Sequence, residues 1–309
     1  MRSTTLILVL GPTAVGKTAY AIRLAQQLDT EIVNCDSRQC YSEMNIGVAR
    51  PSPEELMAVP HHFIANRSVR NPYNVYTYEQ EALQCLHQLF RKHDTVVAVG
   101  GSGLYADVLC HGISAMPDPL PELRQQLQQR LKREGLASLQ QELERRDPEY
   151  YQQVDLWNPV RVQRALEVCI TTGRPYSQVV SQPAVQRPFA IRKIALRCER
   201  ERLKERIALR TGQMYQQGLL QESMNLLPYR RLRPLNTVGY KEIFAYFDQI
   251  QMLTGYDPLS LTAVQLAETN PLLQQALQNI VTHTWQYAKK QLSYFARDPE
   301  IEWITGDEK

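Results

Sequence analysis

The sequence lacks long apolar runs, paired cysteines and a strong charge of either sign. The longest apolar stretch near its start, residues 6–10, is far too short to span a bilayer, and no small-residue cleavage site of a signal peptide accompanies it. None of the six cysteines forms a Cys-x-x-Cys pair, and no zinc-type histidine spacing accompanies them, which argues against a zinc site and favours reduced thiols. We therefore expect a soluble cytoplasmic protein that binds no membrane.

The net charge of +3 is unevenly distributed along the 309 residues. Residues 120–210 carry 18 basic and 11 acidic side chains, a net charge of +7, and the segments on either side each carry −2. Such a basic block is common on a solvated helical surface, and it is also what a surface that binds a polyanion requires. Both interpretations stay open at this point.

The first third of the chain alternates short β-like runs with helical patterns. Strands that alternate with helices predict an α/β fold with a parallel sheet flanked by helices, and 43% apolar residues can fill its core. The expected strands are residues 5–10, 31–35 and 95–99, and the expected helices are residues 17–28 and 77–92.

The composition of the sequence changes after Pro117, where a proline-rich turn leads into a polar sequence with a helical pattern. This segment predicts an all-helical insertion at residues 118–188, within an α/β core made of residues 1–117 and 189–309. Beyond the first third, the expected helices are residues 155–170, 200–217, 240–253 and 272–295, and the expected strands are residues 189–198 and 300–305.

The sequence GPTAVGKT fits the phosphate-binding P-loop pattern Gly-x-x-x-x-Gly-Lys-Thr. It follows a strand pattern and precedes an amphipathic helix, so backbone N–H groups and the helix N-terminus would face one anion, as in a P-loop NTPase-like fold. Lys17 would reach the terminal phosphate oxygens, and Thr18 would coordinate Mg²⁺. The expected phosphate and substrate site is the whole loop: Gly11, Pro12, Thr13, Ala14, Val15, Gly16, Lys17 and Thr18.

P-loop enzymes that transfer a phosphoryl group normally hold Mg²⁺ with a second acid at the end of a neighbouring strand. The expected strand at residues 95–99 is the natural place for it, but a glycine-rich turn containing Ser102 follows instead. The acid follows the other expected strand, as Asp36. Because α/β proteins place their chemistry at the carboxyl ends of strands, Asp36 could assist Mg²⁺ or act as a general base, or it could cap the next turn.

Short motifs follow one another in order from Gly11 to Phe295: GPTAVGKT, DSRQCY, IGVARPS, PHHF, GGSGLY, RVQRALEV with Thr172 and Gly173, VGYKE and AKKQLSYF. This ordered set covers nearly the whole chain and resembles the tRNA dimethylallyltransferase (tRNA isopentenyltransferase) family in its bacterial form. Val15, Ser102 and the last motif depart from the commoner family residues. Val15 still offers its backbone N–H, and Ser102 keeps a hydroxyl.

The resemblance implies that the loop binds the diphosphate of an isoprenoid donor. The exocyclic amine of the adenine next to the anticodon in tRNA would attack dimethylallyl diphosphate, and diphosphate would leave. The loop amides, Lys17 and Mg²⁺ on Thr18 suit the stabilisation of the leaving charge. Asp36 could take the proton that the amine sheds, and the resemblance adds Ser102 and Arg210 as further catalytic residues.

The acceptor adenine must leave its stack, and the basic helical insertion is expected to offset that cost through phosphate contacts. Arg161 and Arg164 lie three apart on one helix face and could follow an RNA backbone. The histidines of PHHF suit structural hydrogen bonds better than a metal. The resemblance assigns tRNA contacts to Asp36, Ser37, Arg38, Gln39, Ser102, Arg124, Val160, Arg161, Val162, Gln163 and Arg164.

Two other classes share parts of this pattern. A small-molecule or nucleoside kinase would have the P-loop and the parallel sheet, but also an acid after residues 95–99 and a smaller lid than the basic block. A P-loop RNA-binding regulator would not require Asp36 beside the loop. We therefore predict a monomeric prenyltransferase with Mg²⁺ as cofactor and with tRNA and dimethylallyl diphosphate as partners; whether ATP competes at the loop stays open.

Overall fold

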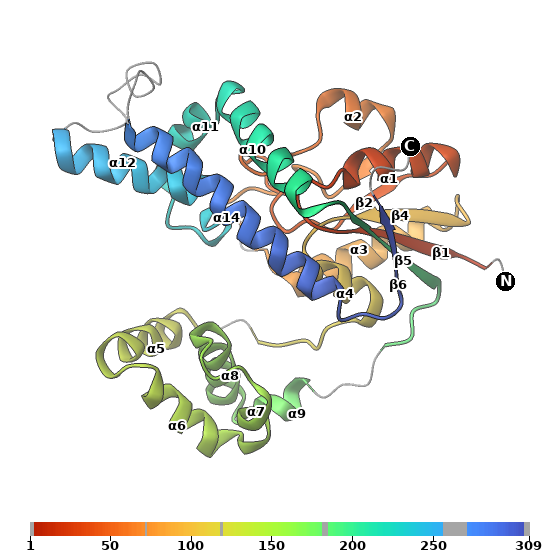
Figure 1. Cartoon of the computed structure of the whole chain (residues 1–309). Coiled ribbons are helices and arrows are strands. Elements are labelled where there is room, and N and C mark those ends of the chain that lie inside the picture. Colours follow the sequence, from red (N-terminus) through yellow and green to blue (C-terminus); the bar gives the residue numbers. More distant parts are fainter. Residues whose placement is uncertain (1–2, 72, 118–119, 181–184, 256–270, 306–309) are drawn as a thin grey trace. The chain divides into compact units, whose positions relative to one another are not determined.

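The computed structural model describes residues 3–71, 73–117, 120–180, 185–255 and 271–305 (Figure 1). The chain folds into two compact units. The first combines Met1–Cys110 with Arg187–Lys309, and the second comprises His111–Gln186. Within these described ranges, no helix is long and apolar enough to cross a membrane.

A six-stranded parallel sheet forms the centre of the first unit. Its strands are β1 (Thr5–Leu10), β2 (Ile32–Asn34), β3 (His61–His62), β4 (Thr95–Val99), β5 (Ala190–Arg197) and β6 (Ile301–Thr305). They lie in the order β3-β2-β4-β1-β5-β6. The predicted α/β class and parallel sheet are confirmed, and β1 and β4 have the predicted bounds. The sequence did not predict β3, because two residues carry no alternation to detect.

Helices cover both faces of this sheet. The helices of the first unit are α1 (Lys17–Gln27), α2 (Pro53–Ala58), α3 (Val75–Leu89), α4 (Gly103–His111), α10 (Arg200–Gln216), α11 (Leu219–Leu226), α12 (Tyr240–Thr254) and α14 (Pro271–Phe295), with short 3₁₀ turns at Leu227–Tyr229 and Arg233–Leu235. Of these, α11 and α12 pack in a separate apolar cluster with the start of α14. Along β1, Val9 packs with Ala21 and Ala25 of α1. Leu8 and Leu10 point to the opposite face and line a small cavity with α4. Burial on both faces explains why β1 is apolar from Leu6 to Leu10.

The adjacent histidines form the edge strand β3 and make structural hydrogen bonds. Nδ1 of His61 lies 2.7 Å from the Val59 carbonyl oxygen, and Nε2 of His62 lies 2.7 Å from Oε2 of Glu31. These contacts tie β3 to its own loop and to the start of β2, and they are the kind of contact expected for PHHF.

The second unit is all helical in its described part. Its helices are α5 (Pro121–Glu134), α6 (Leu136–Arg146), α7 (Pro148–Gln153), α8 (Pro159–Thr172) and α9 (Tyr176–Val180). They enclose an apolar core of their own, in which Leu139, Leu143 and Leu166 are fully buried. The compact unit begins and ends a few residues before the predicted insertion of 118–188.

The second unit is electrically balanced, which corrects the expectation of a basic helical insertion. Residues 111–186 contain nine basic and nine acidic side chains, whereas residues 187–210 contain nine basic and three acidic ones. The prediction was wrong because the charges were counted over residues 120–210, a range that extends across the boundary between the two units. The basic excess belongs to the first unit, on β5 and α10.

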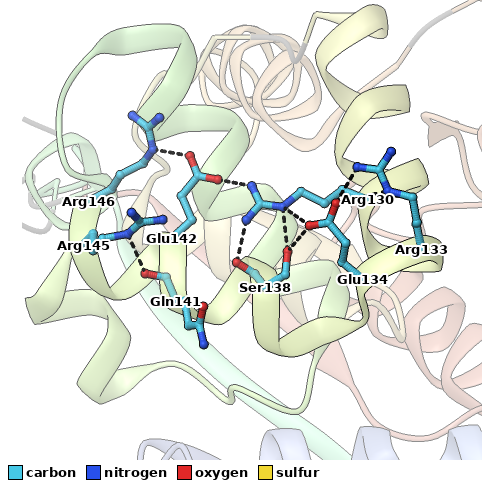
Figure 2. A network of polar contacts seen from close by, with 8 residues as sticks. All are labelled: Arg130, Arg133, Glu134, Ser138, Gln141, Glu142, Arg145 and Arg146. Carbon is cyan, nitrogen blue, oxygen red and sulfur yellow. Dashed lines mark hydrogen bonds and ion pairs between the residues drawn. The ribbon is translucent and has the colours of Figure 1, made fainter.

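Several arginines of α5 and α6 are neutralised within the second unit (Figure 2). Arg130 contacts both Glu134 and Glu142, and Arg146 contacts Glu142 at 2.7 Å. Arg130 also donates to the carbonyl oxygen of Ser138 at 2.8 Å, which joins α5 to the first turn of α6. These side chains are therefore occupied in holding the two helices together.

A buried ion pair anchors the chain just before β5. Arg187 pairs with Glu79 of α3, with side chains only 6% and 4% exposed, and its Nε donates to the Leu109 carbonyl oxygen at 3.0 Å. Replacing Arg187 by alanine would leave Glu79 buried without its partner, so we expect the free energy of unfolding to fall by about 3–5 kcal/mol. The exposed pair Arg192–Glu302 is the matched control, and Arg192→Ala should cost less than about 1 kcal/mol. Urea denaturation measures both values, and equal effects would contradict this assignment.

Candidate active site

The predicted phosphate-binding loop, Gly11–Thr18, joins β1 to α1 at the carboxyl end of the sheet. Gly11 has a φ of 134°, and a Cβ at this position would lie 2.6 Å from the Leu196 carbonyl oxygen of β5. Ala14 and Gly16 also have left-handed backbone, with φ of 65° and 102°. Gly16 precedes α1 without a side-chain cap, so the first N–H groups of the helix are available to an anion.

Lys17 folds back against this loop. Its Nζ donates to the Pro12 carbonyl oxygen at 2.7 Å. The pKa of Lys17 is lowered to about 8, chiefly by burial and next by the positive charge of Arg210, while nearby Asp36 acts in the opposite direction. A bound anion would offset both lowering effects, so the loop favours a negatively charged ligand.

Two arginines of α10 reach the loop from a distant part of the chain. The guanidinium of Arg210 donates to Oγ1 of Thr13, and Nη1 of Arg206 donates to the Val15 carbonyl oxygen at 3.2 Å. Burial lowers the pKa of Arg210, and the charge of Asp36 opposes that effect. Arg210, which the resemblance implies as a site residue, therefore contacts the loop, and so does Arg206, which the sequence did not single out.

Asp36 follows β2, and its negative charge acts to raise the pKa values of Lys17 and Arg210. Its Oδ1 accepts the backbone N–H of Arg38 at 2.8 Å and of Gln39 at 3.3 Å, so the residue does cap the next turn. Its Oδ2 has no hydrogen bond to any residue in the described ranges. Capping thus uses one carboxylate oxygen and leaves the other for chemistry.

Ser102 lies beside the same turn. Its Oγ accepts the backbone N–H of Ser37 at 3.1 Å and lies 3.1 Å from the Ser37 hydroxyl. The phenol of Tyr287, on α14, interacts with Ser102, while partial burial and the charge of Asp36 raise the pKa of Tyr287 to about 12. Asp36, Ser37 and Ser102 are therefore brought together next to a phenol that stays protonated.

The glycines of GGSG allow this close approach. A Cβ on Gly100 would lie 2.6 Å from the backbone of Cys35, and one on Gly103 would collide with the ring of Tyr294. A Cβ on Gly101 would collide with the side chain of Gln291. Residues without a side chain are therefore required in this second glycine turn, because it packs closely against the end of β2 and against α14.

Gln291 joins the two glycine loops and was not predicted as a site residue. Its Oε1 accepts the backbone N–H of Thr13 at 2.8 Å, and its Nε2 donates to the Gly101 carbonyl oxygen at 2.7 Å. The side chain is buried, and both ends of its amide are used. Its presence in the AKKQLSYF motif was the one signal available.

Three of the predicted tRNA-contact residues of the second unit gather around one buried carboxylate. Nε of Arg124 lies 3.0 Å from Oε1 of Glu167, and Nη1 of Arg164 lies 3.4 Å from its Oε2. Gln163 donates to Oε1 at 3.3 Å. Because the Glu167 side chain is only 2% exposed, this carboxylate fixes the orientation of the three polar side chains.

The other predicted contacts on α8 differ in exposure. Val160 is 74% exposed and Arg161 is exposed, so both are accessible to a partner. Val162 is fully buried among the apolar side chains of the unit. The Val162 side chain therefore contributes to packing.

A magnesium ion at the loop would be held by few protein ligands. Within the described part of the chain, no three His, Cys, Asp or Glu side chains are grouped to hold a metal ion. Mg²⁺ at phosphate sites usually takes one or two protein oxygens and completes its shell with phosphates and water. The hydroxyl of Thr18, in the first turn of α1, is the protein ligand expected for a metal that arrives with phosphates.

Comparison with known proteins decides the family. Residues 39–298 match the family model described as IPP transferase. The chain belongs to the IPP transferase family. The resemblance seen in the ordered motifs is thereby confirmed.

Individual relatives agree with this family over almost the whole length of this chain. The chain is 43% identical over 305 residues to tRNA dimethylallyltransferase 1 of Bacteroides thetaiotaomicron, covering 99% of this chain and 92% of that protein. The solved full-length tRNA isopentenylpyrophosphate transferase of Bacillus halodurans is 28% identical, with a TM-score of 0.66 over 98% of this chain and 90% of its own. A eukaryotic dimethylallyltransferase acting on tRNA is 22% identical and has a TM-score of 0.77, over 98% of this chain and 74% of its own, which supports the fold.

Proposed function

We propose that this protein transfers a dimethylallyl group from dimethylallyl diphosphate to the exocyclic amine of the adenine next to the anticodon in tRNA, releasing diphosphate. The observation that carries the proposal is the phosphate loop with Lys17 and Arg210 on one side and Asp36 on the other. A phosphoryl-transfer site would instead have its acid after β4, where Gly100 stands. The names of the relatives support prenyl transfer over the kinase alternative.

The proposed reaction is a displacement at the first carbon of the donor. The amine nitrogen forms a bond to this carbon while the carbon–oxygen bond breaks, and diphosphate leaves with the electron pair. The loop N–H groups, Lys17 and Arg210 stabilise the negative charge that grows on the leaving oxygen. Mg²⁺, held by Thr18 together with the diphosphate, would add positive charge there.

The amine must lose a proton as it attacks. Oδ2 of Asp36 is the proposed acceptor, because Oδ1 is occupied by the turn that follows. Ser102 and Tyr287 are proposed to hydrogen-bond the reacting groups, since both hydroxyls lie at this turn. The catalytic residues of the proposal are thus Asp36, Ser102 and Arg210, with Tyr287 as an additional candidate.

The tRNA is proposed to contact both units. On the first, the turn from Asp36 to Gln39 would meet the adenine, which is extruded from its stack as in other enzymes that modify bases. On the second, the insertion at residues 118–188 would hold the anticodon stem and loop, through Arg124 and the start of α8. We also propose that the protein acts as a monomer in the cytoplasm.

The lowered pKa of Lys17 predicts how donor binding depends on pH. Protonated Lys17 is the form that binds diphosphate, and its proton is lost as the pH rises through about 8. We expect kcat/KM for dimethylallyl diphosphate to fall above about pH 8 and to level off at higher pH, because Arg210 and the loop N–H groups remain. A pH–rate profile measures this, and Lys17→Arg should move the alkaline fall to higher pH. A profile that stays flat up to the pKa of an ordinary lysine, about 10.4, would contradict the assignment.

Separate incubations with two different donors test the proposed reaction type. The protein is incubated with tRNA and either dimethylallyl diphosphate or ATP, and the released diphosphate and any transferred phosphate are quantified. We expect diphosphate release that depends on tRNA with the first donor and no phosphate on RNA or nucleoside with the second. Phosphate transfer from ATP without prenylation would overturn the proposal in favour of a kinase.

A further inference from the structure

Three positive side chains surround one tryptophan on the surface of α10 and α14. The charged groups of Arg200, Lys204 and Lys289 lie 5.5, 5.4 and 5.8 Å from the ring centroid of Trp285. We call these four residues the Trp285 cluster. Each distance is within the range of a cation–π contact. The indole therefore holds three like charges close together, although they repel one another.

Little negative charge offsets this cluster. Lys204 pairs with Glu201 at 2.9 Å, but the Glu201 side chain is 72% exposed, so the pair contributes little. Arg200 and Lys289 are exposed and form no ion pair with any residue that the structure describes. Elsewhere in the same basic segment, the side chains of Arg187 and Lys193 are buried and paired with carboxylates.

The cluster borders the phosphate-binding loop. Trp285 packs in the same apolar cluster as Val15 of the loop. Arg206, on the same helix as Arg200, donates to the Val15 carbonyl oxygen at 3.2 Å. Figure 1 shows α10 and α14 side by side in the first unit. The positive surface thus begins next to the loop.

The balance of charge between the two units adds a second argument. RNA binding draws most of its affinity from cations that contact phosphates. The second unit has no net charge, and several of its arginines are occupied by glutamates. The missing electrostatic contribution is therefore expected from the first unit, where residues 187–210 carry the excess.

We propose that the Trp285 cluster binds phosphates of the tRNA backbone next to the phosphate-binding loop. The identity of the RNA rests on the proposed function, whereas the polyanion specificity rests on the cluster itself. A diphosphate already has the loop, Lys17 and Arg210 as its partners. Three cations spread over two helices suit the spaced phosphates of a nucleic-acid strand.

Equilibrium binding of the intact protein to tRNA, measured as the KCl concentration is varied, tests this proposal. The test variant is Arg200→Gln/Lys204→Gln/Lys289→Gln, which removes three charges and keeps side chains of similar length on Trp285. The matched control is Arg23→Gln/Arg91→Gln/Lys92→Gln, which removes three exposed charges from α1 and the end of α3. A charge-preserving variant, Arg200→Lys/Lys204→Arg/Lys289→Arg, checks that charge rather than folding is responsible.

We expect the test variant to bind tRNA about 10- to 100-fold more weakly near physiological salt, with a log–log salt slope shallower by about 2 to 3. The control and the charge-preserving variant should keep the original slope, and KM for dimethylallyl diphosphate should be unchanged in all three. A test variant with the affinity and slope of the control would overturn the proposal. Because binding is measured without catalysis, loss of prenyl transfer in the unsubstituted protein would contradict only the proposed function.

Discussion

Replacing Asp36 by asparagine is expected to lower kcat for prenyl transfer by about 10²–10⁴, the usual contribution of a general base. Asparagine keeps an oxygen that can accept the N–H groups of Arg38 and Gln39, so the turn stays formed. It replaces the second carboxylate oxygen by an amide that cannot take the proton. Single-turnover rates at saturating tRNA and donor, near pH 7 where Lys17 is protonated, measure the effect.

Two comparisons make this result specific to Asp36. Asp29→Asn changes an exposed carboxylate between α1 and β2 and should leave kcat unchanged. Asp36→Ala also removes the turn cap, so it should lower the free energy of unfolding by about 1 kcal/mol in addition to lowering kcat. Undiminished prenyl transfer by Asp36→Asn would show that the carboxylate serves only the turn.

Replacing Arg210 by glutamine is expected to lower kcat/KM for dimethylallyl diphosphate by about 10²–10³, the size of effect seen when one stabilising donor is lost. The reason is that Arg210 is a partly buried cation held at the loop through Thr13, where the leaving group's charge would grow. Arg202→Gln, an exposed change on the same helix, is the control and should have little effect on this value.

A second readout separates this electrostatic role from a structural one. The charge of Arg210 helps to lower the pKa of Lys17. Its removal should therefore shift the alkaline fall of kcat/KM to higher pH, whereas loss of packing alone would leave the position of that fall unchanged. An unshifted fall in Arg210→Gln, or an unchanged kcat/KM, would contradict the assignment.

The strands around the loop could be predicted because they are buried on both faces. A strand of this kind has an uninterrupted apolar sequence, and β1 and β4 each consist of such a run preceded by one threonine. The P-loop was predictable for a related reason, since its chemistry depends on the backbone of one short segment. β3 has no such pattern of its own and exists through its pairing with β2.

Contacts between distant segments were beyond the reach of local patterns. Gln291 is 278 residues from Thr13 along the chain, and a single glutamine in a polar helix gives no sign that both ends of its amide are occupied. Arg206 and Arg210 lie in a helix rich in charge, and only the packing of α10 beside the loop distinguishes them. The excess of basic side chains was assigned to the wrong unit, because the basic stretch of sequence continues past Arg187, where the chain returns to the first unit.

The central claim is that the loop holds a leaving group whose carbon chain moves to an RNA base. Mass spectrometry of nucleosides from tRNA treated with the protein and dimethylallyl diphosphate tests it most directly. The account predicts one adenosine per acceptor tRNA, next to the anticodon, that carries a dimethylallyl group on its exocyclic nitrogen, together with an equal amount of diphosphate. Unmodified adenosine in tRNA that lacked the modification beforehand, despite turnover of the donor, would contradict it.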